Sequence, residues 1–200
     1  MSVQPDPILN RAATPTAAAS PRRVLSARQA NRLERLVDAA VEELRAHGYE
    51  GLTVRAVATR CGVAAATAYT YFASKDHLVA EIFWRRLCAL PEVTTQPSED
   101  AVVEVLRATV SIVADEPAVG TACTAALLAQ DPEVSTLRDL IGAELTRRIG
   151  VALGDAATPQ LLTDLGSYWA GAFLMSGLGY ATFAETAENL DRGARALMRG

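Results

Sequence analysis

The sequence predicts an all-α fold of about nine helices. Half of its 200 residues are hydrophobic and only 6% are aromatic, and its many alanines favour closely packed helices over a sheet. Runs of β-branched residues bounded by turn signals, which would predict strands, are missing from the sequence. Apolar residues instead recur at spacings of three and four between helix-capping signals.

The first 25 residues are expected to form a disordered arm, because they hold four prolines and an alanine-rich run. They lack the apolar segment of a signal peptide. Arg22 and Arg23, near the end of the arm, are placed to reach a DNA minor groove, as basic arms do in other proteins. The alternative is a solvated leader without a role.

The first helix is predicted to begin at the capping-box pattern Ser26-x-x-Gln29 and to end at Gly48. Its apolar positions recur at three and four and form one stripe: Leu33, Leu36, Val37, Ala40, Val41 and Leu44. Residues 49–52 are expected to form a turn. Thr53 is then a suitable N-cap for a second, short helix.

A second short helix follows Gly62 in the stretch GVAAATAYTYFASKDHL, which covers residues 62–78. Two short helices joined by a turn at a glycine describe a helix-turn-helix, whose second helix enters the DNA major groove. Phe72 is expected to lie in the core. Because Tyr69 and Phe72 would share one face of a helix and Tyr71 would point elsewhere, at least one tyrosine should be exposed.

Capping residues predict where the later helices begin. Ser74 and Ser98 are suitable N-caps, and the pairs Asp131-Pro132 and Thr158-Pro159 combine an N-cap with a proline at the first helical position. The last helix is expected over residues 186–198.

Residues 165–184 form a run of twenty residues without a charge. Such a run is long enough to span a bilayer. Several glycines, serines and threonines lower its hydrophobicity, and no clusters of Arg or Lys flank it. We therefore expect a buried helix and no contact with a membrane.

The sequence offers no metal site, disulfide framework or cofactor motif. Cys61, Cys88 and Cys123 are odd in number and lie in apolar contexts, so we expect reduced, buried thiols, with redox sensing as the alternative. The chain has only two histidines, His47 and His77, and no glycine-rich phosphate loop. An enzyme would need a nucleophile or an acid–base pair, and none is evident.

Charge is distributed unevenly along the chain. Residues 1–76 hold ten Arg and Lys against seven Asp and Glu, whereas residues 77–200 hold nine against sixteen. The helix-turn-helix therefore lies in the positive part of a chain whose net charge is −4. The asymmetry is compatible with a few well-placed phosphate contacts.

The helix-turn-helix segment resembles the tetracycline-repressor (TetR) family over about residues 30–85. The resemblance is carried by residue types and spacings at Gly51-Leu52-Thr53, Val57-Ala58, Gly62-Val63, Thr67, Tyr69, Tyr71-Phe72, Ser74-Lys75 and Leu78. It implies an all-helical, homodimeric, cytoplasmic repressor. Residues 26–73 would then form a three-helix DNA-binding domain, and residues 74–200 a helical ligand-binding and dimerisation domain.

The resemblance also implies which residues contact DNA. Arg55 would contact a base or a phosphate, and the start of the recognition helix would lie nearest the base edges, namely Ala65, Ala66 and Thr67. Phosphate contacts would come from Thr53, Tyr69, Tyr71 and Lys75, which is the only lysine of the chain. Helix N-termini, tyrosine hydroxyls and an ammonium group all donate to phosphate oxygens.

The recognition helix departs from the family pattern at three alanines. Ala64, Ala66 and Ala68 stand where the family commonly has Ser, Gly and Leu. Ala64 removes the N-cap of this helix, at a cost of about 1 kcal/mol. Base recognition is then expected to depend on Arg55, Thr67, Thr70 and DNA shape.

The second domain is predicted to respond to a small hydrophobic or amphipathic effector, whose binding would release a double-stranded, pseudo-palindromic DNA operator. The resemblance implies that helices of this domain surround one cavity per subunit. Side chains on those helices expected to line it are Phe83, Trp84, Cys123, Leu127, Trp169 and Phe173, with polar contacts from Tyr168, Ser176 or Thr124. The alternative is a core filled by these side chains, in a constitutive repressor without a ligand.

Overall fold

The computed structural model describes residues 26–200, and the expected N-terminal arm lies outside this range. The described residues form helices and no strands, as the sequence predicts. Their bounds are α1 Ala27–Gly51, α2 Val54–Arg60, α3 Ala65–Tyr69, α4 Lys75–Ala89, α5 Glu99–Ser111, α6 Pro117–Leu127, α7 Pro132–Leu153, the 3-10 turn η1 Gly154–Ala156, α8 Pro159–Gly177 and α9 Phe183–Arg199.

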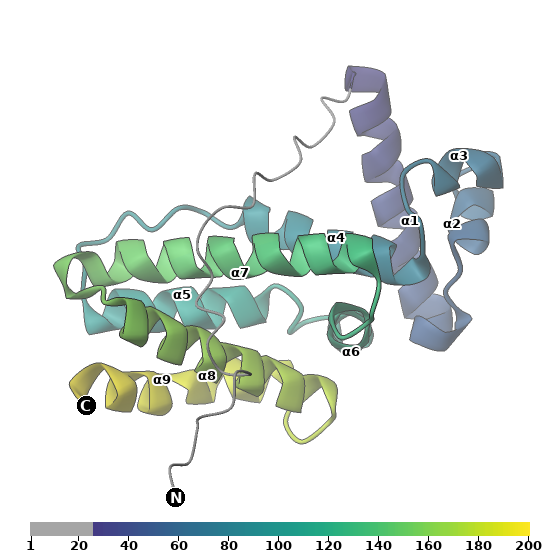
Figure 1. The fold of residues 1–200 in the computed structure, drawn as a ribbon. Helices are drawn as coiled ribbons and strands as arrows, with labels where there is room; N and C mark the ends of the chain where they lie inside the picture. Colours follow the sequence, from purple (N-terminus) through teal and green to yellow (C-terminus); the bar gives the residue numbers. More distant parts are fainter. Residues whose placement is uncertain (1–25) are drawn as a thin grey trace, which may run out of the picture.

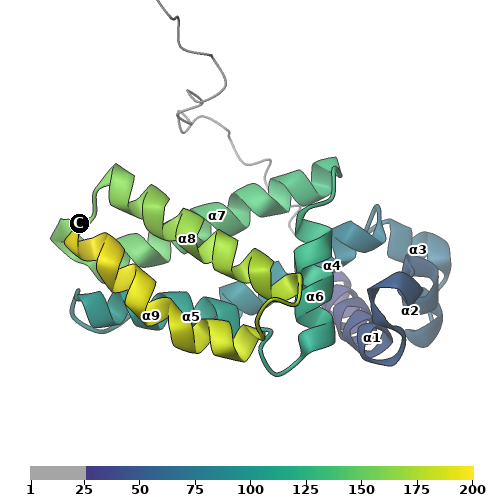
Figure 2. The ribbon, with the colours of Figure 1, turned by 90° about the horizontal axis from the view of Figure 1, so that it is seen from below.

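The first three helices form a separate group at one end of the molecule (Figure 1). α4 leads from this group into the larger part, where it packs against α6 and α7. α8 and α9 pack on each other and form the lowest layer of Figure 1. Seen from below, α6 crosses between these helices and the group of α1 to α3 (Figure 2).

The helix starts expected from capping residues are confirmed. In each case the side-chain oxygen accepts a backbone N–H of the first turn: Ser26, Thr53, Ser74, Ser98, Asp131 and Thr158. The predicted start of the last helix was wrong, because α9 begins at Phe183. Thr182 and Glu185 form a capping box there, in which Glu185 Oε2 accepts the Thr182 N–H at 2.8 Å.

Gly48 interrupts α1, as the sequence indicated, but the chain then makes one more helical turn. The backbone of Gly48 has φ 66° and ψ −177°, which a residue with a side chain rarely adopts. Residues 49–51, expected to be a turn, extend α1 beyond this kink and present Tyr49 to the start of α4.

The uncharged run is divided between two helices. α8 ends at Gly177 and α9 begins at Phe183, and no described helix is both long and apolar enough to cross a membrane. α8 buries one side only, through Leu165, Trp169, Phe173 and Ser176. Its opposite side is exposed, so the expectation of a helix buried on both faces is wrong for the single chain.

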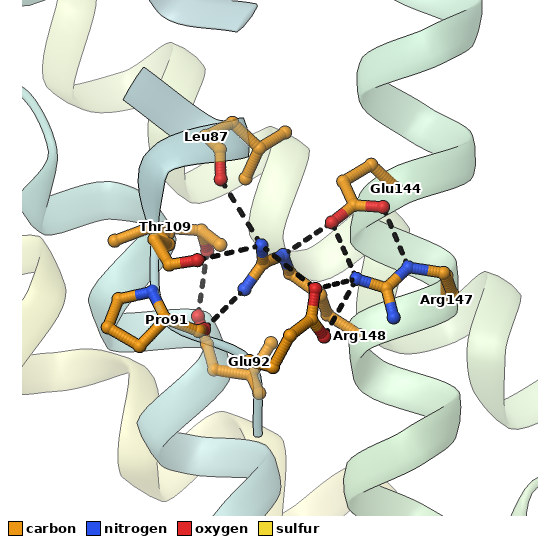
Figure 3. Close-up of polar contacts among 9 residues, drawn as sticks. Leu87, Pro91, Glu92, Thr109, Glu144, Arg147 and Arg148 are labelled. Atoms are coloured by element: carbon orange, nitrogen blue, oxygen red, sulfur yellow. Dashed lines mark hydrogen bonds and ion pairs between the residues drawn. The ribbon is translucent and has the colours of Figure 1, made fainter. Parts of the chain in front are cut away.

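Arg148 of α7 is buried near the end of α4. Its guanidinium donates to the carbonyl oxygen of Leu87, within α4, at 3.4 Å (Figure 3). It also donates to those of Leu90 at 3.1 Å and Pro91 at 2.8 Å, just after the helix. The last carbonyls of a helix lack partners within the helix, so they are ready acceptors for a buried cation. Arg148 therefore caps α4 from a neighbouring helix.

Carboxylates balance the charge of Arg148. Glu144 accepts its Nε–H at 2.7 Å and also accepts from Arg147, which in turn contacts Glu92 at 2.8 Å (Figure 3). A buried ion is tolerated only when it is paired and fully hydrogen-bonded.

The expectation of buried cysteines is correct in part, because Cys61 and Cys123 are buried but Cys88 is exposed.

Candidate functional site

The candidate DNA-binding surface is built by α2, α3 and the turn between them. The turn is closed by the Val63 N–H, which donates to the Ala58 carbonyl at 3.0 Å. Gly62 has φ +66°, so a side chain at this position would strain the backbone. The glycine thus fixes the angle at which α3 leaves α2.

α3 is only five residues long and ends at Tyr69. Tyr69 is 53% exposed, whereas Phe72 is 1% exposed and belongs to the core. The two rings therefore do not share a helix face, because Phe72 lies in the turn after α3. The expectation of an exposed tyrosine and a buried Phe72 is nevertheless correct, and Tyr71 is partly buried.

The structure brings the predicted DNA-contact residues to adjoining elements. Arg55 and Thr53 lie at the start of α2, and α3 carries Ala65, Ala66, Thr67 and Tyr69, with Thr70 at its C-cap. Thr53, Arg55, Ala66, Tyr69 and Thr70 are exposed, and Ala65 and Thr67 are partly exposed. The set is accessible to a macromolecular partner.

Hydroxyl groups at this surface differ in what they can still donate. Thr53 Oγ1 accepts the Ala56 N–H at 3.0 Å, so its own O–H remains available to a phosphate. Thr70 Oγ1 donates to the Thr67 carbonyl at 2.6 Å. Unless this bond breaks, the Thr70 hydroxyl can only accept a hydrogen bond from a partner. Thr53 is therefore the better phosphate donor of the two.

Lys75 is held by Tyr49, for which the sequence predicted a turn but no contact. Its Nζ donates to the Tyr49 carbonyl at 3.2 Å and lies 4.1 Å from the centre of the Tyr49 ring. The Tyr49 hydroxyl donates to Asp76, and burial together with this carboxylate raises the pKa of Tyr49. Lys75 keeps N–H groups for a phosphate, because an ammonium group has three donors.

A buried carboxylate, Glu43, joins α1 to α2. It accepts from Arg60 Nε at 2.5 Å and contacts His47 Nδ1 at 3.0 Å. The hydrogen bond from Arg60 lowers the pKa of Glu43 despite its burial. Sequence reasoning missed this residue, and the available signal was a glutamate beside the apolar stripe of the first helix.

Ala64 precedes α3 in an extended conformation with φ −64° and ψ 140°, and no side chain caps the helix. The sequence prediction of an uncapped recognition helix is thus confirmed. The backbone N–H groups at the start of α3 remain without a side-chain acceptor from this position.

A cavity of about 420 Å³ lies between α6, α7 and α8. Its walls are mostly apolar and include Leu127, Ile141, Leu145, Trp169 and Phe173, and its polar lining residues are Thr124, Arg138 and Thr146. Three of the six predicted pocket residues, Leu127, Trp169 and Phe173, are brought together here. The volume lies in the range of small-molecule sites.

The other three predicted pocket residues do not line this cavity. Phe83 is fully buried and packs edge-on against Phe173, with ring centres 5.2 Å apart. Cys123 is fully buried in the core, and burial raises the pKa of its thiol to about 12. Trp84 packs against the start of α7. Apolar periodicity cannot separate a cavity wall from the core behind it.

Trp169 stacks on Phe173 with ring centres 5.2 Å apart and planes inclined by 16°. Its indole N–H is buried and has no hydrogen-bond partner, which costs about 1–3 kcal/mol. Of the predicted polar groups, only Thr124 lines the cavity, since Ser176 contacts Thr186 of α9 at 2.6 Å and Tyr168 lies against Gly193.

Residues 36–82 match the family model described as bacterial regulatory proteins, tetR family. An uncharacterised HTH-type transcriptional regulator of Mycobacterium tuberculosis is 44% identical over 167 residues, which cover 82% of this chain and 78% of that protein. The HTH-type transcriptional repressor KstR of Rhodococcus jostii is 28% identical over 131 residues, covering 64% and 62%.

Solved structures share the fold. A TetR transcriptional regulator from Rhodococcus superposes with a TM-score of 0.72 at 24% identity, covering 88% of this chain and 99% of that one. The regulator FadR from Bacillus subtilis, solved in complex with stearoyl-CoA, superposes with a TM-score of 0.60 at 14% identity, covering 80% and 95%. Both similarities show that the helices are arranged in the same fold.

The missing cap of α3 leads to a stability prediction. We expect Ala64→Ser to raise the free energy of unfolding by about 1 kcal/mol, because a serine hydroxyl at this extended position accepts a first-turn N–H. Thr53→Ala, which removes the existing cap of α2, should lower it by a similar amount. Urea denaturation measures both. An Ala64→Ser protein no more stable than the parent would contradict the prediction.

Proposed function

Because the chain belongs to the TetR family of transcriptional regulators, we propose that it is a repressor whose dimer binds a pseudo-palindromic operator and is released by a small effector. The carrying observation is the exposed set of donors on α2 and α3 at one end of the molecule, with an apolar cavity between α6, α7 and α8 in the larger part. A regulator of this kind acts on the chromosome, in the cytoplasm.

DNA binding is supported by the chemistry of the α2–α3 surface. Tyr69 and Arg55 are exposed donors, and the free hydroxyl of Thr53 stands at the N-terminus of α2. These groups suit phosphate oxygens, whereas the alanines of α3 allow close apolar contact with the groove. Such a surface binds DNA chiefly through contacts with the DNA backbone and through the shape of the duplex.

Dimer formation is supported by the exposed side of α8. Ser167, Ala170, Gly171 and Met175 are exposed on one helix that carries no charge after Asp164. A continuous, uncharged and apolar surface of this kind is typical of subunit interfaces. Two-fold symmetry would present two α3 helices to two half-sites.

Effector binding is supported by the cavity between α6, α7 and α8. Its apolar walls suit an apolar or amphipathic molecule. A ligand oxygen that reached the Trp169 N–H would remove the penalty of an unpaired donor. Stearoyl-CoA, which FadR binds, is one amphipathic candidate. A constitutive repressor, with the cavity serving no ligand, is the alternative.

The DNA-binding proposal predicts a loss of affinity in Tyr69→Phe. Removing one donor from each protomer should cost about 1 kcal/mol per protomer, or about 2 kcal/mol and roughly 30-fold in affinity for the dimer, because one phosphate contact is lost on each half-site. The measurement is a fluorescence-anisotropy titration with the upstream region of the protein's own gene and with random duplex. Tyr180→Phe, in the exposed turn before α9, is the control and should bind like the parent. Parent protein that prefers neither duplex would refute operator binding.

The dimer proposal predicts that charge on α8 separates the subunits. Ser167→Glu with Met175→Glu should give a monomer of 21.2 kDa by light scattering, because two like charges would meet across the interface. Ala143→Glu, at an exposed position of α7, should leave the dimer intact. A monomeric parent at micromolar concentration would disprove the interface.

The effector proposal predicts that filling the cavity abolishes ligand binding. A Cβ on Gly142 would meet nothing within 4 Å, so Gly142→Phe can place its ring in the cavity. In a Trp84→Phe background, stearoyl-CoA should change the Trp169 fluorescence and release DNA over the same concentrations. Gly142→Phe should lose both effects and Ala143→Phe should keep them. If DNA release survives in Gly142→Phe, the cavity is not the effector site.

A further inference from the structure

The start of α1 extends beyond the core of the DNA-binding part. α1 begins at Ala27, but its first buried residue is Leu33. The capping box of Ser26 and Gln29 stabilises this extension. In Figure 1 the first turns of α1 rise above α2 and α3 at the top of the view.

Three arginines lie along one face of this part of α1. Arg28, Arg32 and Arg35 are spaced by four and three residues, so their side chains form a row. Arg35 Nη2 donates to the Cys61 carbonyl at 2.9 Å, at the end of α2. The row therefore faces the turn that leads into α3, and Arg28 and Arg32 continue it beyond that turn.

Three acidic side chains of α1 lie on the side that faces α4. Glu34, Asp38 and Glu42 are spaced by four and line a hollow opposite Arg85 and Arg86 of α4. These three carboxylates lie toward α4, beside Arg45 of the same helix, whereas Glu43 lies toward α2 and pairs with Arg60.

No ion pair between described residues engages Arg28 or Arg32. Arg45 and Arg60 of the same domain are paired with Glu116 and Glu43. Guanidinium groups free of carboxylates, beside a DNA-binding turn, have the charge and the reach to contact phosphates.

α3 itself contributes few donors, because Ala65 and Ala66 occupy its first turn. Affinity must then come from phosphate contacts made elsewhere. We propose that Arg28 and Arg32 form a phosphate-binding row that extends the DNA interface from the helix-turn-helix onto the flanking duplex. The proposal rests on the DNA-binding function proposed above.

The position of the row indicates which part of the duplex it contacts. The start of α1 lies at the top of Figure 1, and α8, which carries the proposed dimer surface, lies in the lower part. The row is therefore on the side of each subunit away from its partner. In a dimer it would contact phosphates at the outer ends of the operator.

The test compares the salt dependence of DNA binding. Arg28→Gln with Arg32→Gln removes both charges and keeps residues that favour helices. The slope of log affinity against log salt should become shallower by about 0.9 for each lost contact, and affinity at low salt should fall roughly tenfold. The loss should be equal for the gene's upstream DNA and for random duplex, since phosphates carry no sequence information.

Three controls make the result specific. Arg107→Gln, at an exposed position of α5, should leave the slope unchanged, and Arg28→Lys with Arg32→Lys should preserve it. Duplexes trimmed at both outer ends should bind parent and double variant alike. Circular dichroism and a thermal midpoint establish that the variants fold.

The outcomes separate this proposal from operator binding. An unchanged salt slope in the double variant overturns the phosphate row, whatever the sequence preference. A slope difference that persists on trimmed duplex overturns its placement on the outer ends. A parent protein that binds both duplexes equally would refute operator binding alone, and one that binds no duplex even at low salt would refute both.

Discussion

α4 is held at both of its ends by α7, and the position of the helix-turn-helix depends on these contacts. At the start of α4, Ser74 accepts the His77 N–H and donates to Asp131 Oδ2 at 2.5 Å. Asp131 is itself the N-cap of α7, through its other carboxylate oxygen. The hydrogen bond from Ser74 lowers the pKa of Asp131, which therefore stays ionised and keeps both contacts. At the other end, Arg148 donates to the Leu87 carbonyl of α4 and to those of Leu90 and Pro91 just beyond it.

These contacts constrain how the two parts of the molecule can move. α7 forms one wall of the cavity, and α4 follows the recognition helix after a short turn. A shift of α7 along its axis must either carry α4 with it or leave buried polar groups unpaired, which costs more than the net value of a typical hydrogen bond. Glu116 adds a third connection, because it pairs with Arg86 of α4 and Arg45 of α1. The linked helices therefore respond to displacement as one body.

Local chemistry explains what the sequence could predict. Capping residues and prolines act within one turn of a helix, so Ser74, Asp131 and Thr158 marked helix starts correctly. Contacts between distant residues had no such signal: Arg148 meets Pro91 across 57 positions and Lys75 meets Tyr49 across 26. The family resemblance predicted which residues contact DNA, but it did not predict their geometry. Three of the six predicted pocket residues do not line the cavity, because the core and the cavity walls are built from the same kinds of apolar side chain.

Because α3 is short, its orientation is set by the elements that surround it. A helix of five residues without an N-cap has no stability of its own, because helices far longer than this are marginal in isolation. α3 is fixed instead by Gly62 on one side and by the buried Phe72 on the other, and Tyr49 with Lys75 fixes the start of α4 just beyond. The angle at which α3 meets the groove is thus set by α1, α2 and α4. A contact that moves α4 would change that angle without touching any residue of α2 or α3.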